Sequence, residues 1–288
     1  MEKYTGSTGT GQEEDVAKAA LLTYMEEKTK RNVAVAFSGG ADSSLILYMA
    51  VQAARKNGSQ VYAICIHTTL HPHGESEQAR RMAEDMGALF EEIRVDEFEQ
   101  AGITDNPVDR CYRCKSYMFR NLQNRAKELG IDTIMDGTNE DDLHVYRPGV
   151  KALKELGIAS PLAECGVTKA QVRTLLKEYG ISAAQKPSMP CLATRFPYGT
   201  HLTKEELHRV DEAEGYLREM GFYNVRVRVH DKIARIEVDA GDVQKIVENR
   251  NRITEKLKAL GYGYVTLDLE GFRSGSMDQD LPEARTYK

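Results

Sequence analysis

Short apolar runs alternate with longer segments of helical periodicity over the first 200 residues. The run Val33-Ala34-Val35-Ala36 has no polar position, which is typical of a strand buried on both faces of a parallel sheet. Comparable patterns predict strands at 61–66, 89–95 and 133–135, and helices at 13–30, 75–86, 111–129 and 168–179. Strands that alternate with helices in this way predict an α/β domain whose parallel sheet is covered by helices.

The pattern changes after Thr200. A helix at 203–220, strands at 225–229 and 234–238, a helix at 242–260 and a strand at 264–269 predict an α-β-β-α-β unit. We therefore predict two domains, a parallel-sheet domain over 1–200 and a small α+β domain over 201–288. The second domain is expected to bind substrate, to pack against another subunit of a homo-oligomer, or to do both.

Composition narrows the class of protein. The chain has 288 residues, of which 41% are hydrophobic and 29% charged, and its net charge of −5 gives no overall electrostatic footprint for nucleic acid. No apolar run approaches the roughly 20 residues that span a bilayer, and the first residues have no apolar signal segment. We expect a cytoplasmic enzyme without a membrane partner; the net charge disfavours nucleic acid as a partner but leaves a local basic patch open.

A polar, glycine-containing turn, Ser38-Gly39-Gly40-Ala41-Asp42-Ser43, follows the strand at 33–36 and precedes a predicted helix. Gly39 and Gly40 let the backbone approach a ligand closely, because they carry no Cβ. Ser43 and Ser44 are expected to cap the helix, whose free N–H groups and dipole favour an anion. The turn is therefore predicted to bind an anion.

An acidic turn, 136–142, follows the strand at 133–135 and contains Gly137 and Thr138. The carboxyl ends of parallel strands meet at one edge of a sheet, so we expect this turn near the anion-binding turn. A solvated acidic loop is the alternative, since Asp and Asn are common in turns.

Five cysteines are an odd number for a disulfide framework. Cys111 and Cys114 are three residues apart and share one side of a predicted helix. Cys191 lies in a proline-rich loop with Lys186 and Arg195, cations that favour a thiolate. A Cys-x-x-Cys pair suits a metal cluster, a zinc site or a redox disulfide.

Arg226 and Arg228 alternate with valines in the strand at 225–229. Two guanidinium groups on one face can bind a phosphate or a carboxylate. A half-solvated sheet edge explains the pattern equally well.

Several motifs together resemble one family. Ser38–Ser43 resembles the PP-loop of ATP pyrophosphatases. Together with the turn 136–142, the segment Pro190-Cys191-Leu192-Ala193-Thr194-Arg195 and the tail 267–277, it makes the chain similar to the LarE family. Its members are ATP-dependent sulfur transferases in the assembly of the nickel-pincer nucleotide. They adenylylate the carboxylates of pyridinium-3,5-biscarboxylic acid mononucleotide and convert them to thiocarboxylates.

The resemblance implies roles for individual residues. Asp42 would hold Mg²⁺ and act in catalysis, and Cys191 would take part in sulfur transfer. The ATP-binding residues would be Ser38, Gly39, Gly40, Asp42, Ser43, Gly137 and Thr138, and the substrate-binding residues would be Arg195, Arg226 and Arg228.

The sulfur source divides the family. In one branch the cysteine at the position of Cys191 gives up its own sulfur and becomes dehydroalanine. In the other branch three cysteines, here Cys111, Cys114 and Cys191, hold a [4Fe-4S] cluster that carries sulfide from an external donor. The additional pair at 111 and 114 favours the cluster branch, and zinc remains open because it uses the same ligands.

Three other functions remain as alternatives. A cluster-dependent tRNA thiolase also joins a PP-loop to three cysteines. An amidotransferase-like ligase that uses ammonia would have the cysteines as structural zinc ligands. A pure ATP-binding module would release no pyrophosphate with any substrate.

Overall fold

The computed structural model describes residues 11–70, 75–185 and 190–273. Two compact units divide the chain: the first comprises 1–67, 75–95 and 118–186, and the second comprises 68–74, 96–117 and 187–288. The predicted boundary between residues 200 and 201 falls inside the second unit, which also takes two earlier segments.

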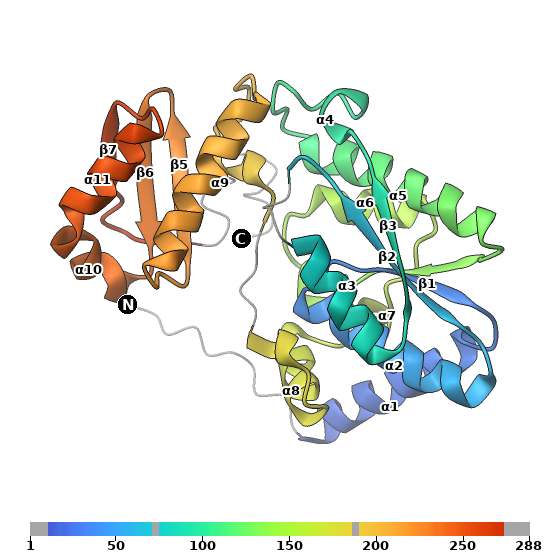
Figure 1. The fold of residues 1–288 in the computed structure, drawn as a ribbon. Helices are drawn as coiled ribbons and strands as arrows, with labels where there is room; N and C mark the ends of the chain where they lie inside the picture. The colour runs from blue at the N-terminus through green and yellow to red at the C-terminus, as the bar shows by residue number, and fades with distance from the viewer. Residues whose placement is uncertain (1–10, 71–74, 186–189, 274–288) are drawn as a thin grey trace. The chain divides into compact units, whose positions relative to one another are not determined.

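A parallel sheet forms the centre of the first unit (Figure 1). Its strands are β1 (Val33–Ala36), β2 (Val61–His67), β3 (Leu89–Arg94) and β4 (Thr133–Met135), in the order β3-β2-β1-β4. Successive side chains of a strand point to opposite faces, and Val33, Ala34 and Val35 are all fully buried. Both faces of β1 are therefore covered, as the apolar run predicts.

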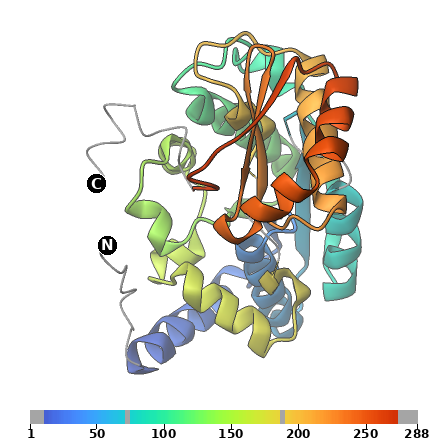
Figure 2. The same ribbon diagram turned by 90° about the vertical axis from the view of Figure 1, so that its left-hand side faces the viewer.

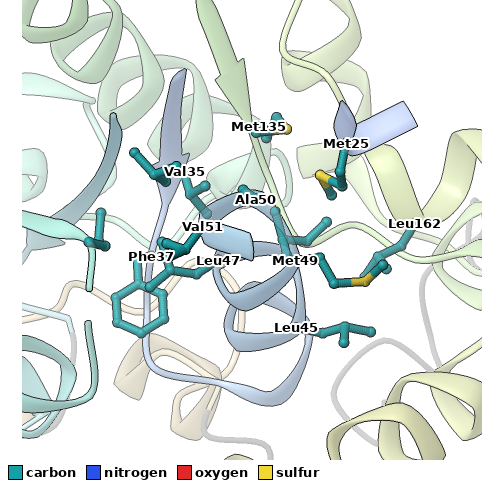
Figure 3. Packing of buried hydrophobic residues seen from close by; sticks show 14 of the residues in the cluster. Met25, Val35, Phe37, Leu45, Leu47, Met49, Ala50, Val51, Met135 and Leu162 are labelled. Carbon is teal, nitrogen blue, oxygen red and sulfur yellow. The ribbon is translucent and has the colours of Figure 1, made fainter. Parts of the chain in front are cut away.

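Helices and short turns surround this sheet. They are α1 (Gly11–Lys28), α2 (Ala41–Asn57), α3 (Glu75–Met86), η1 (Glu140–Leu143), α6 (Pro148–Glu155), α7 (Pro161–Glu164), α8 (Lys169–Glu178) and η2 (Ser182–Gln185). Helix α2 lies in the middle of the core, where Leu47 and Met49 belong to the same apolar cluster as Val35, Met25 and Leu162 (Figure 3). This packing fixes the start of α2 against the end of β1.

The strand order places a switch point beside β1. From β1 the chain adds β2 and then β3 on one side, and it returns to add β4 on the other side of β1. In open α/β sheets, ligands bind at such a switch point, outside the carboxyl ends of the strands. The turns after these two strands are the two that the sequence predicts to meet.

The second unit has a small mixed sheet, β5 (Val225–His230), β6 (Ile233–Val238) and β7 (Tyr264–Leu267), in the order β5-β6-β7. Strand β6 pairs antiparallel with β5 and parallel with β7. Figure 2 shows α9 (Lys204–Glu219) and α11 (Arg250–Ala259) on the same face of this sheet. The remaining elements are α4 (Glu97–Gln100), η3 (Leu192–Arg195), η4 (Ala240–Asp242), α10 (Val243–Glu248) and α5 (Arg110–Glu128), which continues into the first unit after Tyr117.

One helix prediction in this unit is wrong. The segment 242–260 forms two helices, α10 and α11, which meet at Asn249. The Asn249 side chain donates to the carbonyl oxygen of Lys245 at 2.8 Å. An asparagine side chain that binds the backbone in this way competes with the regular helix, which is consistent with the interruption at Asn249.

The described helices differ from membrane-spanning helices in length or in composition. None of them combines the length with the apolar composition that crossing a bilayer requires.

Candidate functional site

The turn between β1 and α2 has the backbone geometry of an anion site. Gly39 has a φ of 68°, in the left-handed region that favours glycine, and Gly40 is the extended N-cap of α2. The predicted capping by Ser43 and Ser44 is wrong, because both lie inside the helix and no side chain caps Gly40. The Ser43 hydroxyl instead donates to the carbonyl oxygen of Gly40 at 3.2 Å. The first N–H groups of α2 therefore stay available to an anion.

The turn after β4 lies directly against this site, as its position at the same sheet edge predicts. A Cβ on Gly137 would stand 2.9 Å from the backbone nitrogen of Ser43 and 3.0 Å from the Cβ of Asp42. Only glycine allows this approach without displacing the loop. The two turns thus form one surface.

A buried carboxylate orders the second turn. Asp136 accepts hydrogen bonds from the hydroxyls of Thr138 and Ser160, each at 2.6 Å. Asn139 then begins η1, and its side chain and that of Asp142 form a reciprocal capping box. These contacts hold the Gly137–Asn139 backbone in place.

Asp42 has two partners that sequence reasoning missed. The Nδ2 atom of Asn139 donates to its carboxylate at 3.3 Å, and the Lys169 ammonium forms an ion pair with it. Lys169 is the first residue of α8, and its backbone N–H donates to Asp141 at 2.7 Å. The sequence predicts that a helix starts at Thr168, but it does not predict that Lys169 pairs with Asp42, which lies 127 positions away. The site therefore contains a lysine, Lys169, whose positive charge can be paired either with Asp42 or with a phosphate group.

The three predicted sulfur ligands belong to the second unit. Cys111 and Cys114 lie near the start of α5, and Cys191 is the N-cap of η3. None of the three is in a disulfide, and each is partly buried. Burial first, and then the negative charges of Cys191, Glu97 and Cys111, raise the pKa of the Cys114 thiol to about 12.

Cys191 and Cys111 therefore both lie close enough to Cys114 to act on its thiol. Cys114 and Cys191 also pack against one apolar cluster. Within the described ranges, however, no group of three or more His, Cys, Asp or Glu side chains is arranged to hold a metal ion. The donor chemistry fits iron or zinc, and the side chains must reorient to bind either.

Arg195 is enclosed by its own unit. Its Nε and Nη2 atoms donate to the two oxygens of Glu214, both at 2.8 Å, and neither side chain is exposed. Its Nη1 atom donates to the carbonyl oxygens of Pro190 (2.8 Å) and Cys191 (3.2 Å) and to the hydroxyl of Thr194 (2.9 Å). Its charge is balanced by Glu214, and its contacts fix the backbone around Cys191.

Arg226 and Arg228 lie on the face of β5 opposite the valines, and both are buried. The interpretation as a half-solvated edge is therefore wrong. Arg228 donates to Glu237 at 3.0 Å and to the carbonyl oxygen of Thr194 at 2.6 Å. Burial, followed by the positive charge of Arg195, lowers the pKa of Arg226 to about 10. Such a crowded cationic environment favours an incoming anion.

Two parts of the predicted site lie outside the described residues. These are Lys186, expected beside Cys191, and residues 274–277 of the tail motif.

Comparison with known proteins identifies matches over most of the chain. Residues 13–147 match the family model described as a PP-loop domain. An uncharacterised protein of Synechocystis is 40% identical over 86% of this chain and 92% of its own length. The pyridinium-3,5-bisthiocarboxylic acid mononucleotide synthase of Lactiplantibacillus plantarum is 37% identical over 93% of this chain and 96% of its own length. A tRNA-specific 2-thiouridylase of Geobacter metallireducens is 28% identical over 56% of this chain and 54% of its own length.

Proposed function

Because the chain belongs to the LarE family, that of pyridinium-3,5-bisthiocarboxylic acid mononucleotide synthase, we propose that it is an ATP-dependent sulfur transferase. Its substrate is pyridinium-3,5-biscarboxylic acid mononucleotide, and its product carries thiocarboxylates for the nickel-pincer nucleotide. The observation that carries the proposal is the 37% identity with that synthase over 93% of the chain.

The reaction needs ATP because a carboxylate is a poor electrophile. A carboxylate oxygen attacks the α-phosphorus of ATP, the bond between the α- and β-phosphates breaks, and pyrophosphate leaves. A sulfur nucleophile then attacks the acyl carbon, and AMP leaves with the former carboxylate oxygen. Each exchange therefore consumes one ATP and releases one pyrophosphate.

The first unit supports the adenylylation half of this proposal. The N–H groups at the start of α2 would bind the pyrophosphate portion of ATP, with Gly137 and Thr138 beside it. Asp42 supplies the hard carboxylate oxygens that suit Mg²⁺, which would neutralise phosphate charge when bound. Lys169 would then leave Asp42 and donate to the phosphates.

The second unit supports the sulfur half. We propose that Cys111, Cys114 and Cys191 hold a [4Fe-4S] cluster, which provides a site for sulfide from an external donor. Arg226 and Arg228 would bind the anionic groups of the nucleotide, and Arg195 would position the backbone around Cys191. Loss of the Cys191 sulfur as dehydroalanine is the alternative sulfur source. The cytoplasmic location and the homo-oligomer remain predictions from the sequence.

The direct test uses protein purified without oxygen and supplied with ATP, Mg²⁺, sulfide and the biscarboxylate mononucleotide. We expect pyrophosphate release that depends on the nucleotide, and a product whose mass shows exchange of oxygen for sulfur. Iron, sulfide and zinc analysis of the same preparation tests the cluster. Zinc without iron would contradict the proposed cluster, and absence of thiolated nucleotide would contradict the proposed reaction.

The similarity to a tRNA-specific 2-thiouridylase favours tRNA thiolation as a second candidate. The net charge of −5 disfavours it, because binding of nucleic acid depends on cationic contacts to phosphates. A mobility-shift measurement with bulk tRNA at several salt concentrations separates the two. Salt-dependent binding of tRNA and its thiolation would favour the second candidate.

A further inference from the structure

A buried asparagine ties the loop after Cys191 to the segment that precedes Cys111. Asn106 is fully buried and adopts a left-handed φ of 47°. Its side-chain amide donates to the carbonyl oxygens of Phe196 at 3.1 Å and Pro197 at 2.8 Å. Its own carbonyl oxygen accepts the backbone N–H of Gly199 at 3.0 Å. Two segments far apart in the sequence are thus joined close to the cysteines.

Arg110 extends this connection into the cysteine region. It is the first residue of α5 and is only 2% exposed. Its Nη1 atom donates to the side-chain oxygen of Asn106 and to the carbonyl oxygen of Ala193, the latter at 3.4 Å. Its Nη2 atom lies 3.7 Å from the sulfur of Cys111. One guanidinium therefore contacts both the Cys111 helix and the Cys191 loop.

The charge of Arg110 has no carboxylate partner among the described residues. Its Nε atom is buried and forms no hydrogen bond within the described ranges. A buried cation is costly unless negative charge lies near it. The ring centroid of Tyr198 lies 5.5 Å from the guanidinium carbon of Arg110, and the Cys111 sulfur lies 3.7 Å from its Nη2 atom. A thiolate at Cys111 would supply the negative charge that this guanidinium lacks.

We propose that Arg110 is the positioning residue of the three-cysteine centre: it fixes the Cys191 loop to the start of α5 and supplies the positive charge that allows three thiolates to bind one metal centre. The inference rests on the proposed function only in its use of Cys111, Cys114 and Cys191 as metal ligands. It concerns residues of one unit, and it holds for any soft metal that prefers thiolates.

Cadmium binding to the full-length apo-protein tests the inference without the sulfur-transfer reaction. Cd²⁺ prefers thiolates, and the intensity of its sulfur-to-metal absorption reports how many thiolates bind. We expect a three-thiolate signal from the wild type. Arg110→Met should bind Cd²⁺ roughly tenfold more weakly or worse, the usual loss when a group that orients ligands is removed, and its signal should fall to that of two thiolates.

Arg113→Met is the matched control. Arg113 lies between the two cysteines in the sequence, but it pairs with Asp109 at 2.8 Å and with the carbonyl oxygen of Gly102 at 3.2 Å. It should retain wild-type Cd²⁺ affinity. Circular dichroism and ATP affinity, which depends on the first unit, verify that each variant is folded. A folded Arg110→Met protein with wild-type Cd²⁺ affinity and a full three-thiolate signal would overturn the proposal.

Arg110→Lys keeps the charge but loses the planar fork that reaches both Asn106 and Ala193. We expect a Cd²⁺ affinity between those of the wild type and Arg110→Met. If Arg110→Met does not fold, the Cd²⁺ affinity of Arg110→Lys decides alone. Weaker Cd²⁺ binding than in the wild type supports positioning by the planar guanidinium, and unchanged Cd²⁺ binding overturns the proposal.

The midpoint potential of the reconstituted protein tests the effect of the positive charge at residue 110. In protein reconstituted with iron and sulfide, loss of a nearby cation disfavours added electrons, so Arg110→Met should have a more negative midpoint potential than Arg110→Lys. Equal potentials would overturn the role of the charge. If the wild type accepts no cluster but still gives the three-thiolate Cd²⁺ signal, the proposed cluster fails and the inference about Arg110 stands.

Discussion

Replacing Glu214 by glutamine should destabilise the second unit, because it leaves a buried guanidinium without its counter-charge. Both oxygens of Glu214 are engaged: they accept the two Arg195 bonds at 2.8 Å and the backbone N–H of Val227 at 2.9 Å. Arg218 adds a further contact at 3.3 Å. Neither Glu214 nor Arg195 has an exposed side chain, so water cannot replace the lost charge.

The magnitude follows from this burial. Removing one partner of a buried ion pair costs about 3–5 kcal/mol, and we expect about 3 kcal/mol because glutamine keeps the shape and one acceptor. A loss of that size lowers the melting temperature by roughly 6–12 °C in a domain of this size class. The cost is larger than that of an exposed pair, which contributes at most about 1 kcal/mol.

Urea and thermal denaturation followed by circular dichroism measure the effect. Glu212→Gln on the same helix is the matched control, since Glu212 is exposed and lies 3.9 Å from His208. The alkylation rate of Cys191 gives a local readout, because Arg195 should release the Cys191 carbonyl oxygen when its own partner changes. If Glu214→Gln unfolds at the same urea concentration and temperature as Glu212→Gln, the reasoning about the buried pair is refuted.

The pH dependence of the stability gives a second test of the buried pair. Burial raises the pKa of Glu214, but the charge and hydrogen bonds of Arg195 outweigh this, so its pKa in the folded protein is lowered. A lowered pKa means that the stabilising contribution is present above the unfolded value, about 4.5, and is lost as pH falls through the folded value. The wild type should therefore lose stability below pH 4.5 more steeply than Glu214→Gln.

Three further predictions concern the proposed reaction. Asp42→Asn should lower pyrophosphate release on the order of 10²-fold while circular dichroism stays unchanged, and unchanged turnover would remove Asp42 from the magnesium site. Arg228→Ala should raise the KM of the nucleotide substrate about tenfold and that of ATP much less, and equal effects on both would indicate a folding defect. Single serine variants of Cys111, Cys114 and Cys191 should each lose most bound iron and brown colour, because a hydroxyl replaces a thiolate poorly on iron. If mass spectrometry instead finds dehydroalanine at Cys191 after reaction, the sacrificial branch is correct.

Sequence reasoning failed where a local pattern has two structural solutions. The hydroxyls of Ser43 and Ser44 suit a helix cap, but the glycine turn places the helix start before them. The alternation at Arg226 and Arg228 is that of a solvated sheet face, but the segment around η3 covers that face, as the bond from Arg228 to Thr194 shows. The start of α2 and the burial of the β5 arginines both depend on segments that pack against them, and the local sequence pattern does not contain this information.

By itself, the sequence determined the strands, most helices and the two turns at the end of β1 and β4. These depend on apolar periodicity and on glycine, which act over a few residues. Only the tertiary structure decided the partners of the charged groups: Lys169 for Asp42, Glu214 for Arg195, and the cysteine sulfurs for Arg110. An ion pair depends on distance in space and on burial, and Asp42 and Lys169, 127 positions apart in the sequence, acquire both only when the chain packs.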